Sequence, residues 1–276
     1  MPLKIGVDIG GTKIMAGLID DHNHIIQKTT VMNKPLASKQ AVLEHISDII
    51  RPLVSDQVSL IGVGVPAIVD VEKGIVRQVV SIPSWDEVPL KTILEDAFHI
   101  SVLINNDCNC FAQGVALSPA FLSYDNLVCI TLGTGVGAGL IIDKKLYTGT
   151  DSLAGEIGSM AYLDKDYEYY CSSRFFLAHG TTGKEAAQKA ALGCSDALQL
   201  WREMGHHLGQ LLHTVLYAYN PQAIVFGGSI SKSYAFFEAA VRQQLATFPY
   251  ANVVNKLLLT TVDTENTMLL GATHLM

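Results

Sequence analysis

The sequence has few charged residues and no basic cluster. Of its 276 residues 16% are charged, and 19 Lys and Arg against 26 Asp and Glu leave a formal net charge of −7. With no run of Lys or Arg, this balance argues against a broad nucleic-acid surface. A small anionic ligand is not excluded, because backbone N–H groups bind phosphate without any basic side chain.

Long apolar runs and a secretory leader are also missing. The apolar stretches have the length of strands and are interrupted by glycine, well short of the roughly 20 residues that a membrane-spanning helix needs. The chain opens on MPLKIGVDIGG, where a strand begins almost at once. We therefore expect no signal peptide and a cytoplasmic protein without a membrane partner.

The sequence has few cysteines, and their number is odd. The five are Cys108, Cys110, Cys129, Cys171 and Cys194. An odd set in a chain expected to be cytosolic favours free thiols over disulfides. A zinc site at Cys108 and Cys110 is disfavoured, because no second pair accompanies them.

An internal repeat organises what the chain does contain. Residues 5–20 (IGVDIGGTKIMAGLID) align without a gap on residues 128–143 (VCITLGTGVGAGLIID), and Gly10 falls on Gly133. Each copy is typical of a β-hairpin, with two apolar strands joined by a Gly/Thr turn. Any two hairpins share such a pattern, but a duplicated domain is the better interpretation.

Strands and helices alternate after each hairpin. The expected strands lie at 60–65, 102–105 and 223–226, and the expected helices at 41–54, 196–219 and 265–276. This alternation predicts an α/β fold, and the two similar openings predict two lobes with ligands in the cleft. The first lobe is expected at 1–118, joined by the helix at 265–276, and the second at 119–264.

Glycine-rich turns follow the first strand of each copy. The first turn is Asp8-Ile9-Gly10-Gly11-Thr12-Lys13, and the second is Thr131-Leu132-Gly133-Thr134-Gly135. Glycines let backbone N–H groups approach a phosphate closely, and Asp8 suits Mg²⁺, directly or through water. Either turn alone is explained equally well as an ordinary tight turn, whereas the pair is more specific. Gly227-Gly228, after an apolar strand, either admits an adenine ring or is only a strand-to-helix turn.

Asn105-Asn106-Asp107 lies where an apolar strand ends, a common place for ligand-binding residues in α/β proteins. In phosphoryl transfer a carboxylate accepts the proton of the attacking hydroxyl. Asp107 suits this role of catalytic base, with Asn106 orienting a sugar hydroxyl; a helix N-cap is the competing interpretation. Glu156 either binds paired sugar hydroxyls or is a solvated charge in a turn.

Together and in this order, the motifs resemble the ROK family of bacterial sugar kinases and sugar-responsive repressors. The matching segments are Asp8 to Lys13, Gly64-x-Pro66 through Val69-Asp70, Asn106-Asp107-x-Asn109, Leu132 to Gly137, Gly155-Glu156-Ile157-Gly158 and Gly227-Gly228. The resemblance implies two actin-like (ribonuclease H-like) lobes, Mg-ATP as donor, and phosphorylation of a hexose, usually at its 6-hydroxyl. It also implies that Asp107 is the base, that Asn106 and Glu156 bind the sugar beside the Pro66-Ala67 loop, and that both glycine turns bind ATP.

The sequence departs from the family pattern around its zinc motif. Ser159 stands where most members have a His, and residues 167–178 offer only Cys171 where a Cys-rich motif is usual. One thiol does not build a four-ligand site, so we predict no structural zinc. The second sugar-binding Glu has no clear counterpart either, since Cys171, Ser173 or Phe175 takes its place, and Ala67 replaces a common Gly.

Three functions remain after these comparisons of motifs. The leading one is an ATP-dependent hexose or N-acetylhexosamine kinase, with N-acetylmannosamine favoured and glucose, mannose and fructose open. A sugar-sensing regulator is disfavoured, because related repressors carry a helix-turn-helix ahead of the first motif and Asp8 leaves no room for one. A non-catalytic sugar-binding protein is disfavoured by the intact Asn106-Asp107 and glycine turns. Family members are commonly homodimers.

Overall fold

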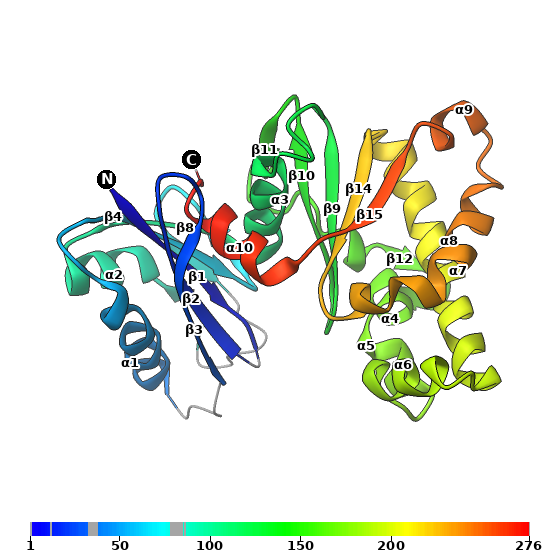
Figure 1. Ribbon diagram of the computed structural model, residues 1–276, viewed down its shortest axis with the longest axis horizontal. Coiled ribbons are helices and arrows are strands. Elements are labelled where there is room, and N and C mark those ends of the chain that lie inside the picture. Colours follow the sequence, from blue (N-terminus) through cyan, green and yellow to red (C-terminus); the bar gives the residue numbers. More distant parts are fainter. Residues whose placement is uncertain (1, 12, 33–37, 78–84, 86, 276) are drawn as a thin grey trace. The chain divides into compact units, whose positions relative to one another are not determined.

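The structure, a computed structural model, describes residues 2–11, 13–32, 38–77, 85 and 87–275. It is an α/β protein with two five-stranded sheets, ordered β3-β2-β1-β4-β8 and β11-β10-β9-β14-β15 (Figure 1). Contacts divide the chain into two units. The first comprises Met1–Leu122, Leu146–Ala154 and Asp263–Met276, and the second comprises Ser123–Lys145 and Gly155–Val262.

The first unit is built on the sheet that contains the N-terminal hairpin. Its strands are β1 (Leu3–Ile9), β2 (Lys13–Ile19), β3 (Ile25–Met32), β4 (Val58–Val65) and β8 (Ser101–Asn106), and its helices are α1 (Lys39–Ile50), α2 (Leu90–Phe98), α3 (Asp107–Leu117) and α10 (Thr264–Ala272). A small sheet adds β5 (Ile68–Asp70), β6 (Ile75–Arg77) and β7 (Glu87–Val88). Strands β1 to β3 are antiparallel, whereas β1, β4 and β8 are parallel.

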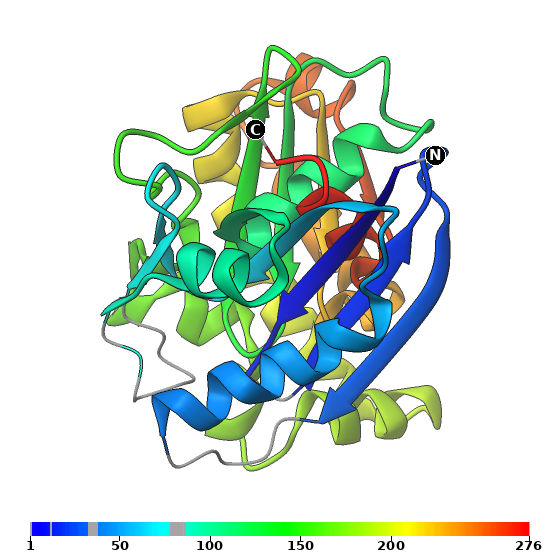
Figure 2. The same ribbon diagram turned by 90° about the vertical axis from the view of Figure 1, so that its left-hand side faces the viewer.

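The two faces of this sheet carry different side chains. Ile5, Val7 and Ile9 point to one face and join the apolar residues of α1 and α2 in the main core; Figure 2 shows α1 lying across the strands. Gly6 and Gly62 are on the opposite face, as expected from the alternation of a strand. A Cβ at either position would lie about 2 Å from a carbonyl oxygen of α10, so this helix packs directly on the sheet.

Helices α3 and α10 also pack closely against each other. A Cβ at Gly271 would lie 1.8 Å from the carbonyl oxygen of Cys110, and one at Gly114 would lie 2.0 Å from that of Thr267. The two helices can approach this closely only because glycine has no Cβ. The start of α3, which carries Asp107, is therefore held in place by the C-terminal helix.

The second unit repeats the strand order of the first. Its sheet is formed by β9 (Leu127–Leu132), β10 (Val136–Ile142), β14 (Ala223–Gly227) and β15 (Leu258–Thr261), together with β11 (Lys145–Tyr147), whose last two residues are grouped with the first unit. A separate short pair is formed by β12 (Ala161–Tyr162) and β13 (Lys165–Asp166). Its helices are α4 (Tyr167–Cys171), α5 (Ser173–Ala178), α6 (Gly183–Ala191), α7 (Ser195–Tyr219), α8 (Tyr234–Leu245) and α9 (Ala251–Val254). Trp201 of α7, fully buried, stacks on Phe237 of α8 at 5.7 Å between ring centroids and closes the core between these helices.

The matching strand orders support the duplication, but the ungapped alignment of the two copies is wrong at the turn. Ile9 pairs with Ile14, which leaves four residues in the first turn, whereas Leu132 pairs with Val136, which leaves three in the second. The first turn closes with Gly10 donating to the Lys13 carbonyl. The second copy closes one residue sooner, so the alignment needs a one-residue gap after the turn.

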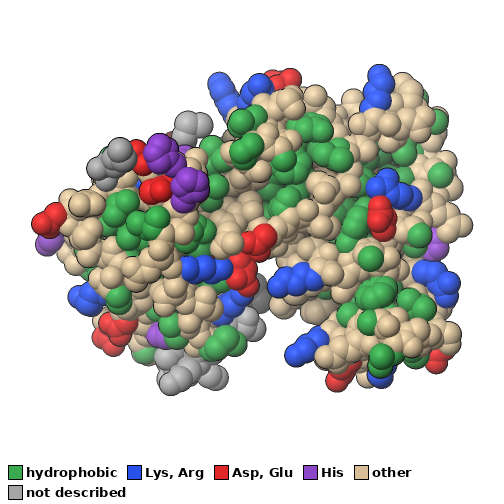
Figure 3. Space-filling view, viewed as in Figure 1, with side chains coloured by type: hydrophobic (Ala, Val, Ile, Leu, Met, Phe, Trp, Pro, Cys, Tyr) green, Lys and Arg blue, Asp and Glu red, His purple; other side chains and the backbone are tan. Residues whose placement is uncertain are grey.

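Two surface properties bear on function. In the described part of the chain, no helix is both long and apolar enough to span a membrane. On the face drawn in Figure 3, Lys and Arg side chains are scattered among apolar and uncharged ones and do not gather in one patch.

Candidate active site

Three neighbouring strands place polar or small residues at the same end of the first sheet. Asp8 of β1 is in register with Gly64 of β4, which is in register with Asn105 of β8. These are the carboxyl ends of parallel strands, where open α/β sheets bind ligands. Asn106 and Asp107 follow directly, as the last residue of β8 and the first of α3.

Asn106 is the N-cap of α3, the role that the sequence offered as the alternative to orienting a sugar hydroxyl. Its Oδ1 accepts the N–H of Cys108 at 2.8 Å, and its Nδ2 donates to the carbonyl of Ala67 at 3.3 Å. The cap therefore also ties α3 to the loop Pro66-Ala67 between β4 and β5. Asp107 Oδ1 accepts the same N–H of Cys108 at 2.9 Å, which fixes one oxygen of its carboxylate.

Two buried asparagines stabilise the junction between β8 and α3. No sequence motif marks them as a pair. Asn105 and Asn109 are each 2% exposed. Asn105 Oδ1 accepts the N–H of Asn106 at 2.8 Å and the Nδ2 of Asn109 at 2.9 Å. The spacing of four residues across the start of a helix was the available signal. These bonds orient the backbone at Asn106.

Asp8 is buried, and the pKa of its carboxyl is raised. Burial raises its pKa from 3.8 to about 7, the nearby Asp107 carboxylate adds to the rise, and Lys13 partly opposes it. Two carboxylates that repel each other form a donor set suited to a hard cation. Among the described residues no three His, Cys, Asp or Glu group as a metal site. Mg²⁺ still fits, since it commonly binds through one or two carboxylates together with substrate phosphates.

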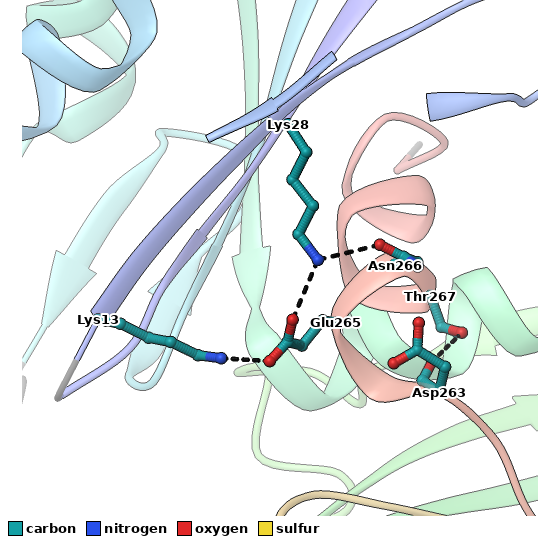
Figure 4. Close-up of polar contacts among 6 residues, drawn as sticks. All are labelled: Lys13, Lys28, Asp263, Glu265, Asn266 and Thr267. Atoms are coloured by element: carbon teal, nitrogen blue, oxygen red, sulfur yellow. Dashed lines mark hydrogen bonds and ion pairs between the residues drawn. The ribbon is translucent and has the colours of Figure 1, made fainter. Parts of the chain in front are cut away.

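The first glycine turn lies next to Asp8. Gly10 donates its N–H to the Lys13 carbonyl at 2.9 Å and closes the turn, Gly11 is exposed, and Thr12 lies outside the described residues. The ammonium of Lys13 forms an ion pair with Glu265 of α10 (Figure 4). The structure thus brings Asp8, Lys13 and Asp107 together within the first unit.

The second glycine turn lies beside Gly227-Gly228 within the second unit. Gly227 is in register with Thr131 across β14 and β9. Gly228 has φ +89°, and a Cβ there would lie 2.2 Å from the carbonyl oxygen of Leu132, the last residue before the turn. Two segments predicted to bind ATP, almost 100 residues apart, are therefore adjacent.

Gly228→Ala is expected to lower the free energy of unfolding by about 2–4 kcal/mol, because it combines an unfavourable φ with a backbone clash. Gly180→Ala is the matched control: Gly180 also has positive φ (+69°), but a Cβ there meets nothing within 4 Å. That control should lose only about 1–2 kcal/mol, the penalty of the left-handed conformation alone. Urea denaturation measures both, and equal losses would contradict the close approach of Gly228 to β9.

Glu156 lies at the surface, between the buried Gly155 and Ile157. The N–H of Ala138 donates to the Gly155 carbonyl at 3.1 Å, so this loop is tied to β10. Partial desolvation raises the pKa of the Glu156 carboxyl, and the nearby carboxylate of Glu168 adds to the rise. Glu156 is therefore one of two adjacent acids.

Glu168 of α4 is a residue that no sequence motif marks, although it lies in the segment 167–178 where the family's zinc motif is missing. Its Oε2 accepts the N–H of Val136 at 3.2 Å, and its Oε1 pairs with Arg174 at 3.0 Å. Ser173 donates its N–H to the Gly133 carbonyl at 2.9 Å. Helices α4 and α5 thus hold the second glycine turn, while Cys171 is fully buried with a thiol pKa raised by burial.

Known proteins resemble the chain along nearly its whole length. The sequence profile of the ROK family matches residues 4–276. The chain is 27% identical to the glucokinase of Thermotoga maritima, over 88% of this chain and 87% of that one, and 26% identical to the xylose repressor of Bacillus subtilis, over 91% and 71%. The structure of a ROK family glucokinase from Streptomyces griseus in complex with glucose and AMPPNP matches with a TM-score of 0.84 and 25% identity, covering 99% and 98% of the two chains. The chain therefore belongs to the ROK family and has the two-lobed, actin-like α/β fold.

Proposed function

We propose that the protein is an ATP-dependent sugar kinase that phosphorylates a hexose or N-acetylhexosamine at its 6-hydroxyl. The observation that carries this proposal is the placement of Asp8, Asn106 and Asp107 in a ROK family chain: Asp8 and Asn106 lie at the carboxyl ends of β1 and β8, the two strands that flank β4, and Asp107 begins α3. Catalysis of phosphoryl transfer depends mainly on positioning the reactants and on stabilising charge, and these three residues are suited to both. ATP as donor implies the cytoplasm as the working compartment.

Asp107 is assigned as the general base. One of its oxygens is held by the N–H of Cys108, which orients the carboxylate without neutralising it. The base accepts the proton of the sugar hydroxyl as the hydroxyl oxygen forms its bond to the γ-phosphorus and the bond to the β,γ-bridging oxygen breaks. ADP leaves with that bridging oxygen, and the sugar leaves as its 6-phosphate.

Binding of the nucleotide phosphates is assigned to Asp8 and Lys13, together with the turn at Gly10, Gly11 and Thr12. The Asp8 carboxylate, raised in pKa by burial and by Asp107, gains from a neighbouring cation. It would hold Mg²⁺, directly or through water, and the bound ion would neutralise charge on the nucleotide phosphates. In the second unit, nucleotide binding is assigned to the residues of the second glycine turn and of the segment after β14: Thr131, Gly133, Thr134, Gly135, Gly227 and Gly228.

Sugar binding is assigned to Asn106, Glu156, Pro66 and Ala67. The bond from Asn106 Nδ2 to the Ala67 carbonyl supports a joint role of these two residues. The S. griseus relative, crystallised with glucose and AMPPNP, supports sugar and nucleotide as ligands of this fold. N-acetylmannosamine is our preferred substrate, because relatives without the zinc motif include that activity; glucose, mannose and fructose are the alternatives.

A coupled ADP-release assay tests the proposal across these four sugars. We expect sugar-dependent ADP release, with kcat/KM for N-acetylmannosamine at least about tenfold above the others, the order of discrimination that a few hydroxyl contacts give. The Asp107→Asn protein is the blank. Thermal stabilisation by a sugar without any ADP release would instead identify a non-catalytic sugar-binding protein, and higher kcat/KM for another hexose would overturn the preferred substrate alone.

A further inference from the structure

Glu265, in the first turn of α10, bridges two lysines of the N-terminal hairpin and its neighbouring strand. Its Oε1 pairs with the ammonium of Lys13, and its Oε2 accepts from Lys28 at 3.0 Å. Lys28 also donates to Asn266 Oδ1 at 3.1 Å. Figure 4 shows both lysines reaching from the sheet to the start of the helix.

The strand register explains why these groups meet. Gly6 pairs with Gly17, and Gly17 pairs with Lys28, so all three lie on one face of the sheet. Leu269 packs on this face against Met15, and Glu265 lies one helical turn before Leu269. Lys13 shares the face because it is two residues from Met15 on β2. The contact therefore follows from the way that α10 packs on the sheet.

Charge also favours a fixed arrangement. Hydrogen bonds from Lys13 and Lys28 lower the pKa of Glu265 to about 2, so its carboxylate stays ionised at neutral pH. Two ammonium groups and one carboxylate leave the cluster with one net positive charge. The carboxylate of Glu265 therefore adds no net negative charge beside the turn, where the carboxylates of Asp8 and Asp107 already lie.

We propose that Glu265 is a positioning residue that holds the Lys13 ammonium beside the β1–β2 turn for the nucleotide phosphates. An ammonium carries three N–H donors, so its bond to Glu265 leaves others for phosphate oxygens. Without this partner, Lys13 is a long flexible side chain whose rotamer entropy is lost when the nucleotide binds. Lys28 and Asn266 fix the carboxylate in turn. The inference rests on the proposed kinase function.

A double-mutant cycle on Lys13 and Glu265 tests this role. Lys13→Met and Glu265→Gln are each expected to raise the KM for MgATP about tenfold or more, the loss that a charge-assisted hydrogen bond explains, with a smaller change in kcat. Because Glu265 acts through Lys13, the double variant should lie within about twofold of Lys13→Met. Glu238→Gln on α8 is the matched control, since Glu238 pairs with Arg242 at 2.8 Å and is similarly exposed.

Multiplicative effects of the two substitutions, or an unchanged KM in Glu265→Gln, would overturn the proposal. A second measurement does not depend on turnover: the ¹⁵N signal of the Lys13 ammonium, assigned by its loss in Lys13→Met, should move in Glu265→Gln and stay in Glu238→Gln. An unmoved signal overturns the positioning role even in an active kinase. A wild-type protein that binds no AMPPNP by calorimetry overturns the kinase function, and the ammonium signal then still decides whether Glu265 holds Lys13.

Discussion

Asp107→Asn is expected to lower kcat by about 1,000-fold while the Kd values for sugar and nucleotide change little, because an amide does not accept the proton of the attacking hydroxyl. The amide oxygen of Asn still accepts the N–H of Cys108, which Asp107 Oδ1 accepts at 2.9 Å in the wild type. The start of α3 should therefore keep its geometry. Single-turnover kinetics measure the chemical step, and calorimetry with sugar and AMPPNP measures binding.

A thermal melt of the same variant separates lost chemistry from lost folding. Asp107 contributes to the raised pKa of the buried Asp8, so removing its charge relieves a repulsion in the native state. The variant should melt at or above the wild-type temperature. Retention of more than about a tenth of the wild-type kcat would show that Asp107 is not the base, because loss of a general base lowers the rate by at least about 100-fold.

Local sequence pattern was sufficient to predict the strand that leads to Asn106 and Asp107, and to predict two of the longer helices. The apolar run before Asn105 predicted a strand at 102–105, and β8 ends at Asn106. The helical spacing at 41–54 and the Asn220-Pro221 stop predicted α1 and α7, whose bounds agree within a few residues. Such features depend on residues close in sequence, which is why polar residues at strand ends were recognisable as candidates.

The contacts made across the sheet were not predictable in the same way. Lys13 and Glu265 are 252 positions apart, and they meet only because glycines let α10 lie directly on β1 and β4. The shorter second turn was missed because Gly-rich segments align equally well with or without a gap. Glu168 was missed because no motif marks a side chain that bonds to the backbone of a distant turn.

Asp8→Asn is expected to stabilise the free protein at pH 8 while abolishing turnover with MgATP. Burial and Asp107 raise the pKa of Asp8 from 3.8 to about 7, so the ionised carboxylate opposes folding above pH 7. A difference of about 3 pKa units corresponds to at most about 4 kcal/mol, and burial of an amide in its place offsets part of this, so a net gain of about 1–3 kcal/mol is expected. Turnover is lost because the proposed Mg²⁺ ligand loses its charge.

The pH dependence of this gain makes the result specific. Above pH 7 wild-type Asp8 is ionised in both folded and unfolded states, and the advantage of Asp8→Asn is complete. As the pH falls from about 7 to 3.8, the folded protein takes up a proton at Asp8 that the unfolded chain does not bind, so the advantage shrinks, and below 3.8 it vanishes. Urea denaturation in EDTA from pH 4 to 8 measures it, with Asp48→Asn, a mostly exposed carboxylate on α1, as control. A gain that is constant with pH, or a loss at pH 8, would show that Asp8 ionises at its ordinary pKa and that burial does not prepare this carboxylate for a cation.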